Sequence, residues 1–217
     1  MFTYAGCSKH TCSPTQAGTV GESASRSALG LGASVKVFDN SLAKLRRLQN
    51  HIGSKVFTSI LQPKVLAKAI RRADVVIGAI RAEKGRNKCI VTEEMVMNMR
   101  KNAVIIDVSI DQGGCFETSE ITTHDEPIFK KFDVIHYCVP NIASRVSRTA
   151  SNAVSNILTP MLLQAGDMGG IEDMVFTNSW FMKGVYTYKG TLTNMHIAKK
   201  FNLNYKELSL LMAARFS

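Results

Sequence analysis

The stretch QAGTVG at residues 16–21 decides the fold, because of the segments that come after it in the chain. A segment of helical periodicity comes next, and an apolar run at Val35–Phe38 then ends in Asp39. In a dinucleotide-binding unit, glycines let the backbone approach a pyrophosphate at a helix N-terminus, and an acidic residue about 20 positions later binds the ribose hydroxyls. Gly18 and Gly21 have the spacing of the second and third glycines. This order favours a nucleotide site over a plain glycine turn.

Two features at the N-terminus disagree with that pattern. Gln16 stands where the first glycine belongs, and Lys9–Thr15 contains no apolar β run. Pro14 also lacks the N–H that a central strand donates to its neighbours. The first strand of the unit is therefore doubtful or replaced. Asp39, in place of a small or basic residue, favours NAD over NADP.

Short apolar runs alternate with helical segments over residues 18–165. Asp74–Ile80 is nearly continuous in its apolar character, which is typical of a parallel strand buried on both faces. The other expected strands are Val35–Phe38, Lys55–Ile60, Ala103–Val108 and Val134–Val139. The expected helices are Leu42–His51, Val65–Arg72, Thr92–Arg100 and a long one at Ile142–Gln164, interrupted only at Pro160. The pattern predicts an α/β fold of the Rossmann type, a doubly wound parallel sheet.

The composition is that of an ordinary globular protein. The 217 residues are 45% hydrophobic and 20% charged, which excludes a disordered chain, a collagen and a disulfide mini-protein. The net charge of +10 comes from Lys36–Lys101, with 15 basic and 5 acidic residues. Solvated helix faces explain this stretch better than a nucleic-acid-binding surface, because only Phe38 and Phe57 interleave the charges. A surface that faces an acidic partner or another part of the protein is a third interpretation.

The sequence favours a cytoplasmic protein. No window approaches the roughly 18 apolar residues of a membrane span, and residues 1–15 lack the apolar region of a secretory signal. The five cysteines are odd in number and have no metal-ligand spacing, so we expect a reducing compartment and no metal site. Cys115 and Cys138 are expected to be small buried side chains, and His124 and His136 to be structural.

Several longer segments resemble the alanine dehydrogenase and proton-translocating transhydrogenase family. They are AGTVGE at 17–22, VFDN at 37–40, RADVVIGAI at 72–80, IDVSIDQGGCFETSEITTHDEPIF at 106–129, HYCVPNIASRVSRTAS at 136–151 and KGVYTYKGTLTN at 183–194. Transhydrogenases are less like the DQGGCFET and VPNIASRVSRTAS segments. The resemblance is therefore to the alanine dehydrogenases of the family.

The resemblance implies how the chain is organised. In the family a substrate lobe precedes the nucleotide domain, a long helix crosses back, and a C-terminal segment completes the first lobe. We therefore expect an unmatched segment at 1–15, an NAD-binding Rossmann domain at 16–141, and the long crossover helix with the return segment of the second lobe at 142–217. The substrate-binding arginine and lysine and the catalytic histidine of the leading lobe have no match here. An incomplete chain with little activity alone is expected, through truncation, a frameshift or a separate subunit.

The implied reaction is the reversible oxidative deamination of L-alanine to pyruvate and ammonium, with hydride transfer to NAD. The resemblance places the family's catalytic aspartate at Asp111, beyond the strand Ala103–Val108, where doubly wound sheets bind their ligands. There it would polarise the substrate amine or the attacking water. An aspartate in an Asp-Gln-Gly-Gly turn is the structural alternative.

The expected NAD-binding residues lie around the same sheet edge. The pyrophosphate side has Gly18, Thr19 and Gly21; the adenosine side has Asp39, Lys44, Ile80 and Arg81; the nicotinamide side has Val108, Ser109, Ile110, Asp111, Val139, Pro140, Asn141 and Ile142. Asn141 either bonds the carboxamide or the substrate, or caps the following helix.

The resemblance also implies the partners, which are L-alanine or pyruvate and further copies of the chain, hexamers being common in the family. Neither nucleic acid nor a membrane is expected to bind. Two other functions stay open, namely a catalytically silent NAD-binding module and a transhydrogenase-like subunit.

Overall fold

The computed structural model describes residues 11–15, 17–53, 56–81 and 88–213. The chain divides into two compact units, Met1–Ile142 and Ala143–Ser217. The first unit contains the large sheet and the glycine stretch, and the second contains the long helix and a small hairpin.

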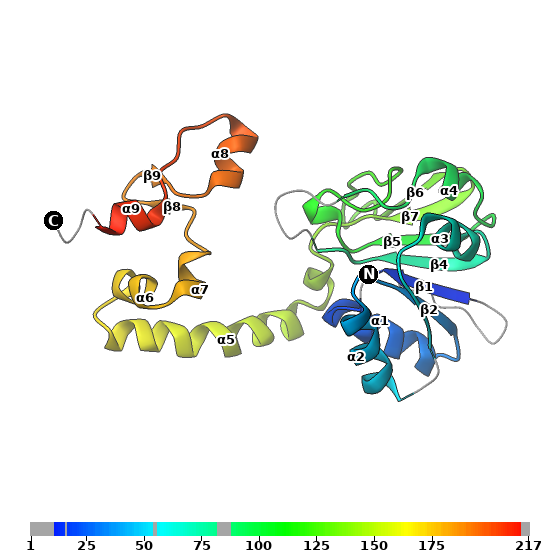
Figure 1. Ribbon diagram of the computed structural model, residues 1–217, viewed down its shortest axis with the longest axis horizontal. Coiled ribbons are helices and arrows are strands. Elements are labelled where there is room, and N and C mark those ends of the chain that lie inside the picture. The colour runs from blue at the N-terminus through cyan, green and yellow to red at the C-terminus, as the bar shows by residue number, and fades with distance from the viewer. Residues whose placement is uncertain (1–10, 16, 54–55, 82–87, 214–217) are drawn as a thin grey trace. The chain divides into compact units, whose positions relative to one another are not determined.

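Within the described residues of the first unit, a seven-stranded sheet has the order β3-β2-β1-β4-β5-β7-β6 (Figure 1). Its neighbouring strands run parallel, except that β6 is antiparallel to β7. The strands are β1 (Thr11–Thr15), β2 (Ser34–Phe38), β3 (Phe57–Ser59), β4 (Ala73–Gly78), β5 (Val104–Asp107), β6 (Ile128–Lys131) and β7 (Val134–Tyr137). The predicted doubly wound parallel sheet is confirmed.

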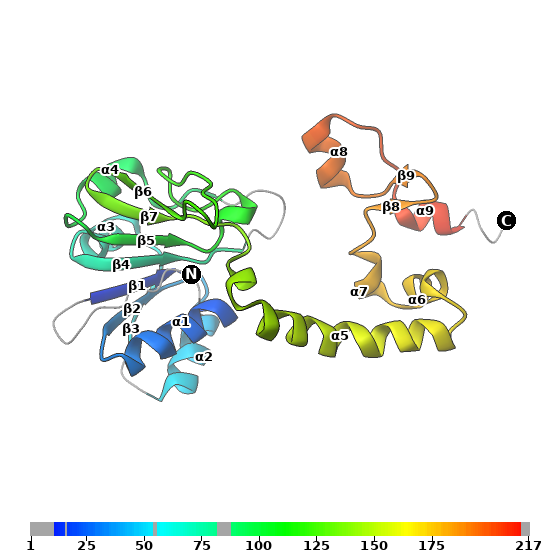
Figure 2. The ribbon, with the colours of Figure 1, turned by 180° about the vertical axis from the view of Figure 1, so that it is seen from behind.

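Helices connect the parallel strands and cover the sheet. They are α1 (Thr19–Gly30), α2 (Leu42–Ile52), α3 (Pro63–Ile70) and α4 (Glu93–Met97), and a 3-10 turn, η1 (Ile110–Gln112), follows β5. Because strand crossovers are right-handed, the reversal of strand order between β1 and β4 sends α1 and α2 to one face and α3 and α4 to the other. Accordingly, α1 packs beside α2, and α3 beside α4 (Figure 2).

Local sequence signals begin and end these helices. The Ser41 hydroxyl accepts the Lys44 N–H at 3.4 Å and so caps α2. Gly53 ends the same helix in the left-handed region, with φ 65°. Pro63 occupies the first position of α3, where its missing N–H costs no helical hydrogen bond.

The expectation of a doubtful first strand is wrong. Although it has no apolar run, Thr11–Thr15 forms β1 between β2 and β4. Pro14 lies opposite Ile77 of β4. The described pairs between β1 and β2 involve Thr11, Cys12 and Thr15, so Pro14 is not among them. Two neighbouring strands supply the pairing that the local sequence does not favour by itself.

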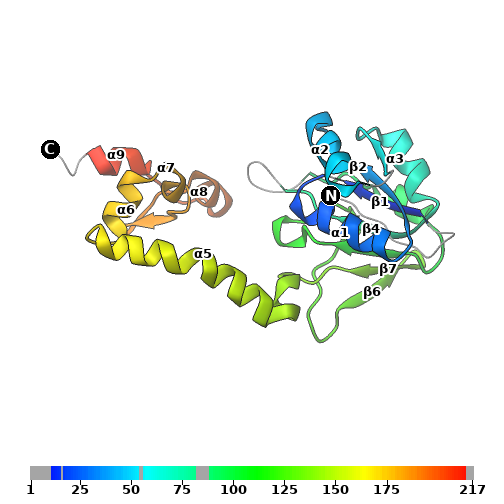
Figure 3. The same ribbon diagram turned by 90° about the horizontal axis from the view of Figure 1, so that it is seen from below.

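The second unit is described by itself. Its elements are α5 (Ser147–Asp167), α6 (Ile171–Thr177), α7 (Ser179–Met182), β8 (Thr187–Tyr188), β9 (Thr191–Leu192), α8 (Met195–Phe201) and α9 (Leu208–Ala213). A 3-10 turn, η2 (Ile142–Val146), precedes α5, so the long helix begins later than expected, and it continues through Pro160. Figure 3 shows α6 beside the C-terminal end of α5. In the part of the chain that the structure describes, we find no helix long and apolar enough to span a membrane.

Candidate functional site

A pocket of about 320 Å³ lies where β4 and β5 end, beside the first turn of α1. This position is the switch point of the sheet, where α/β proteins of this kind bind ligands. Its lining residues are Val20, Ala79, Ile80, Arg81, Val108, Ser109, Asp111 and Gln112. Five of them were expected, namely Ile80, Arg81, Val108, Ser109 and Asp111. Sequence reasoning missed Val20, Ala79 and Gln112, although each is a chain neighbour of an expected residue.

A hollow of about 450 Å³ lies elsewhere, between α3 and α4. Its lining includes Lys64, Lys68 and Arg71 from α3 and its C-terminal end, and Glu94 from α4. It contains none of the expected site residues, all of which are described. The smaller pocket is therefore the better candidate, because it lies at the carboxyl ends of the strands.

The glycine stretch forms the start of α1. Gly18 is the N-cap residue, with φ −82° and ψ −175°, and among the described residues, its chain neighbours aside, a Cβ placed on it would meet no atom within 4 Å. Thr19 is exposed in the first turn, whereas Gly21 is buried in the helix. Within the described ranges of the chain, the space at the Cβ position of Gly18 is thus open, and it adjoins a helix N-terminus, whose partial positive charge favours an anion.

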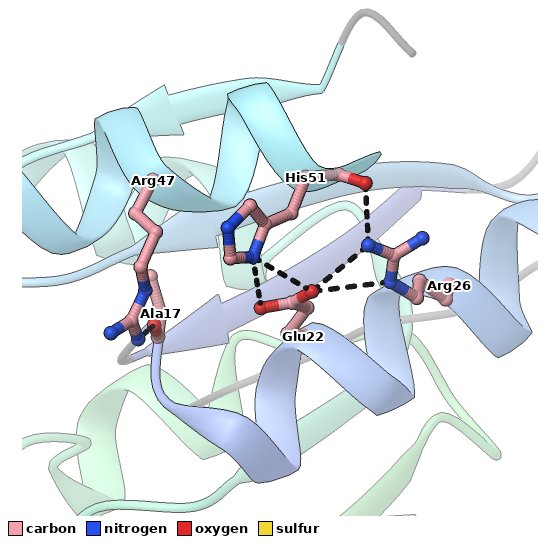
Figure 4. A network of polar contacts seen from close by, with 5 residues as sticks. All are labelled: Ala17, Glu22, Arg26, Arg47 and His51. Atoms are coloured by element: carbon pink, nitrogen blue, oxygen red, sulfur yellow. Dashed lines mark hydrogen bonds and ion pairs between the residues drawn. The ribbon is translucent and has the colours of Figure 1, made fainter. Parts of the chain in front are cut away.

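Asp39 is buried, with 2% exposure, and holds the backbone of this stretch. Its Oδ2 accepts the Ala17 N–H at 2.6 Å, and its Oδ1 accepts the Ser41 N–H at 2.7 Å. Arg47 donates to the Ala17 carbonyl at 3.1 Å (Figure 4). Both backbone groups of the residue before Gly18 are therefore fixed. The predicted ribose acid lies in the expected place, but its carboxylate already accepts two backbone hydrogens.

A polar network holds α1 against α2 behind the glycine stretch (Figure 4). Glu22 Oε1 accepts Arg26 Nη2 at 2.9 Å, and both Glu22 oxygens lie 3.2 Å from His51 Nδ1. Arg26 also donates to the His51 carbonyl oxygen. The hydrogen bond from Arg26 is the main reason that the pKa of Glu22 lies below its usual value. The network therefore fixes the direction in which the N-terminus of α1 points.

Asp111 lies on η1 with its carboxylate exposed. The Asn141 N–H donates to Oδ1 at 3.2 Å and to Oδ2 at 3.3 Å. Asn141 takes the left-handed conformation, with φ 50°, which asparagine tolerates well. The structure thus joins the loops after β5 and β7 through two expected residues. Val146, not Asn141, stands at the N-cap of α5.

The remaining expected residues do not line the pocket. Lys44 is exposed on α2, and Ile110 is 4% exposed with its side chain in the protein interior. Val139, also buried, and the partly buried Pro140 and Ile142 lie on the chain after β7, next to Asn141. Of the residues expected on the nicotinamide side, those that line the pocket all lie in the loop after β5.

Sequence reasoning missed Asp107, which ends β5 and is fully buried. Its Oδ1 accepts Ser109 N at 3.0 Å and Ser109 Oγ at 2.9 Å. Its Oδ2 accepts Cys115 N at 2.9 Å and Ser119 Oγ at 2.7 Å. Both oxygens of this buried carboxylate therefore accept hydrogen bonds from backbone and hydroxyl donors.

The histidine and cysteines near this loop are structural. His136 is buried, with Nδ1 3.1 Å from the Val134 carbonyl and Nε2 2.8 Å from Thr118 Oγ1, and burial lowers its pKa. Burial likewise raises the pKa of Cys138 to about 11 and that of Cys115 well above its usual value. Burial therefore favours the neutral form of both thiols. Among the described residues, no group of three or more His, Cys, Asp or Glu side chains could hold a metal ion.

A family model described as "Alanine dehydrogenase/PNT, C-terminal domain" matches residues 16–195. The chain belongs to this family. The alanine dehydrogenase of Mycolicibacterium smegmatis is 39% identical over 197 residues, which are 91% of this chain and 53% of that protein. The alanine dehydrogenase of Halomonas elongata is 37% identical over 195 residues, which are 90% of this chain and 52% of that protein. This chain of the alanine dehydrogenase/PNT family therefore spans about half the length of these curated relatives.

Solved structures agree with the family assignment. An L-alanine dehydrogenase superposes with a TM-score of 0.79 at 32% identity, over 88% of this chain and 52% of that one. A transhydrogenase from Sinorhizobium meliloti superposes with a TM-score of 0.63 at 22% identity, over 72% of this chain and 45% of that one, which shows a shared fold alone. The resemblance seen in the sequence motifs is confirmed.

Proposed function

We propose that this chain supplies the NAD-binding part of an NAD-dependent L-alanine dehydrogenase, which converts L-alanine reversibly to pyruvate and ammonium. The observation that carries the proposal is the pocket at the switch point, with Asp111 in its lining beside the glycine stretch. The 37–39% identity to alanine dehydrogenases supports the choice of reaction.

The residues around the pocket fit a dinucleotide. The pocket volume of about 320 Å³ falls within the range of small-molecule sites. The open space before Gly18 suits a pyrophosphate, since a helix N-terminus faces it. Asp39 would hold the glycine stretch and accept a ribose hydroxyl on its remaining lone pairs. Val108 and Ser109 would then flank the nicotinamide end, and Ile80 and Arg81 the adenosine side.

NAD, when bound, supplies the hydride acceptor. The chain's own contribution is to orient the substrate and to carry charge near its amine. The exposed carboxylate of Asp111 can accept hydrogen bonds from an ammonium group or an attacking water, and the Asn141 N–H keeps that carboxylate in one orientation. We assign no residue to the substrate carboxylate, and so we propose that the chain has little turnover by itself.

We also propose that the protein works in the cytoplasm as a homo-oligomer. Cys89, Cys115 and Cys138 are free thiols, which fits a reducing compartment.

Two experiments test the proposal. Fluorescence titration of the 217-residue chain with NADH should show saturable binding; absence of binding refutes the proposal. In the second, the chain replaces the matching part of the Mycolicibacterium smegmatis relative, and alanine-dependent NADH formation is measured. The chimera should be active, and Asp111→Ala should abolish turnover while NADH affinity changes less than about twofold. Retained turnover in that variant refutes the role of Asp111. NADH binding without turnover in the chimera favours a silent NAD-binding module.

A further inference from the structure

The carboxylate of Asp107 receives hydrogen bonds from both ends of the loop that carries Asp111. Ser109, at the start of the loop, donates its N–H and its hydroxyl to Oδ1, and Cys115, at the end, donates its N–H to Oδ2. We propose that Asp107 is a positioning residue, which fixes the Ser109–Cys115 loop and thereby places Asp111 and the nicotinamide side of the pocket. This inference rests on the proposed function, because the proposed function assigns NAD to that pocket as its ligand.

The loop is closed on itself between the two anchors. The Gln112 and Gly114 N–H groups both donate to the Ser109 carbonyl, at 2.9 and 3.0 Å. Gly114 has φ 70°, and a Cβ on it would lie 2.8 Å from Asp107 Oδ2. The backbone therefore passes so close to the carboxylate that only glycine fits there. Asp111 lies between Ser109 and Cys115, so its position depends on how Asp107 holds those two residues.

Ser109 extends the same connection to the neighbouring strand. Its hydroxyl has one hydrogen, and Asp107 Oδ1, at 2.9 Å, is the nearest of its described acceptors. The hydroxyl oxygen can then accept the Ile80 N–H at 3.4 Å. Ser109 and Ile80 are both part of the pocket lining, from the loops after β5 and β4. A displaced Ser109 would therefore disturb mainly its own wall of the pocket, since its contact with Ile80 is the longer of the two.

Asparagine is an informative replacement because it has nearly the same size as aspartate. Its amide group can accept on only one side and donates on the other. The Ser109 N–H faces Oδ1 and the Cys115 N–H faces Oδ2, and neither backbone group can reverse its direction. Either orientation of an asparagine side chain consequently opposes one backbone N–H and releases one end of the loop.

The test compares NADH with ADP-ribose, which lacks the nicotinamide and therefore does not occupy the nicotinamide side of the pocket. Both ligands are titrated into the 217-residue chain, Asp107→Asn, Ser119→Ala and the control Asp74→Asn. Ser119 bonds Asp107 at 2.7 Å and is not in the pocket lining, and Asp74 is a partly exposed aspartate paired with Arg100. We expect the Kd for NADH to rise about tenfold in Asp107→Asn, which releases one end of the loop. In Ser119→Ala, which removes one hydrogen bond to Asp107, the Kd should rise about threefold. ADP-ribose affinity should change less than about twofold, and the control should match the parent chain for both ligands.

Two results would overturn the inference. One is an equal loss of NADH and ADP-ribose affinity, which indicates a general loss of structure; the other is unchanged NADH affinity in both variants. If Asp107→Asn does not fold, the ratio of the two affinities in Ser119→Ala decides. If the parent chain does not bind NADH, the proposed function fails. The positioning role of Asp107 is then tested by hydrogen exchange of the backbone amides in the loop. Faster exchange confined to Gln112 and Gly114 in Ser119→Ala supports it, and unchanged exchange contradicts it.

Discussion

Asp39→Asn should destabilise the first unit much more than its small chemical change suggests. The Ala17 and Ser41 N–H groups bond different oxygens of this buried carboxylate, at 2.6 and 2.7 Å. An asparagine amide accepts only one of them and turns its own N–H toward the other. The loss of one charge-assisted hydrogen bond, with a desolvated N–H left unpaired, costs about 2–4 kcal/mol. That is a large part of the roughly 5–15 kcal/mol that stabilises a typical domain.

Urea unfolding followed by circular dichroism measures this cost, and Asp74→Asn is the matched control. Asp74 makes its ion pair with Arg100 at 2.9 Å on the surface, where the Asp74 side chain is 28% exposed. Its replacement should lower the free energy of unfolding by less than about 1 kcal/mol. If the two variants agree within about 0.5 kcal/mol, burial of the carboxylate is not what makes Asp39 stabilising, and the reasoning fails.

Three further changes have outcomes that the structure fixes. Ile105→Ala, at a fully buried position of β5, should cost about 2–5 kcal/mol of unfolding free energy, and Ile106→Ala, at a partly buried position, should cost less; equal losses in urea unfolding would contradict the assigned core. Because folding favours neutral His136, its stabilisation is complete above the ordinary pKa of 6.5 and decreases as pH falls below it. His136→Phe should therefore flatten the loss of stability between about pH 6.5 and 5, and an unchanged slope would exclude this histidine as its source. Glu22→Gln should lower stability by at most about 1 kcal/mol, and the difference should shrink in about 1 M salt, because Arg26 is half exposed; a salt-independent difference would argue against an ion pair.

The sheet was largely predictable because most of its strands are apolar runs. The predicted Asp74–Ile80 overlaps the observed β4 at all but its first residue, and Val134–Val139 encloses β7. Helices begin where Pro63 and Thr92 predict them. Strand β1 was not predictable, since TCSPT has neither alternation nor an apolar run. Its structure comes from pairing with β2 and β4, which are distant in sequence. Local propensity is a weak guide for a strand with two partners.

The same distinction separates the site residues that were predicted from those that were missed. Asp111 and Asn141 follow strands and carry polar side chains, so their place at the sheet edge could be inferred. Asp107 also ends a strand, but its importance lies in the donors around it, which come from positions 2, 8 and 12 residues later in the chain. No periodic pattern records such a convergence. The burial of Asp39 was missed for the same reason, because its partners are backbone groups.

The left-handed Gly113 and Gly114, with φ 96° and 70°, let the chain return to its starting point within one turn. Asp107 and the Ser109–Cys115 loop therefore hold one another in place, and Ile80 and Ser119 add contacts from outside the loop. The Asp111 carboxylate bonds Asn141, outside the loop, so replacement of Asp111 should leave the closure intact. A different residue at position 111 would therefore bring a different reactive group to the switch point of a doubly wound sheet, while the loop keeps its backbone path.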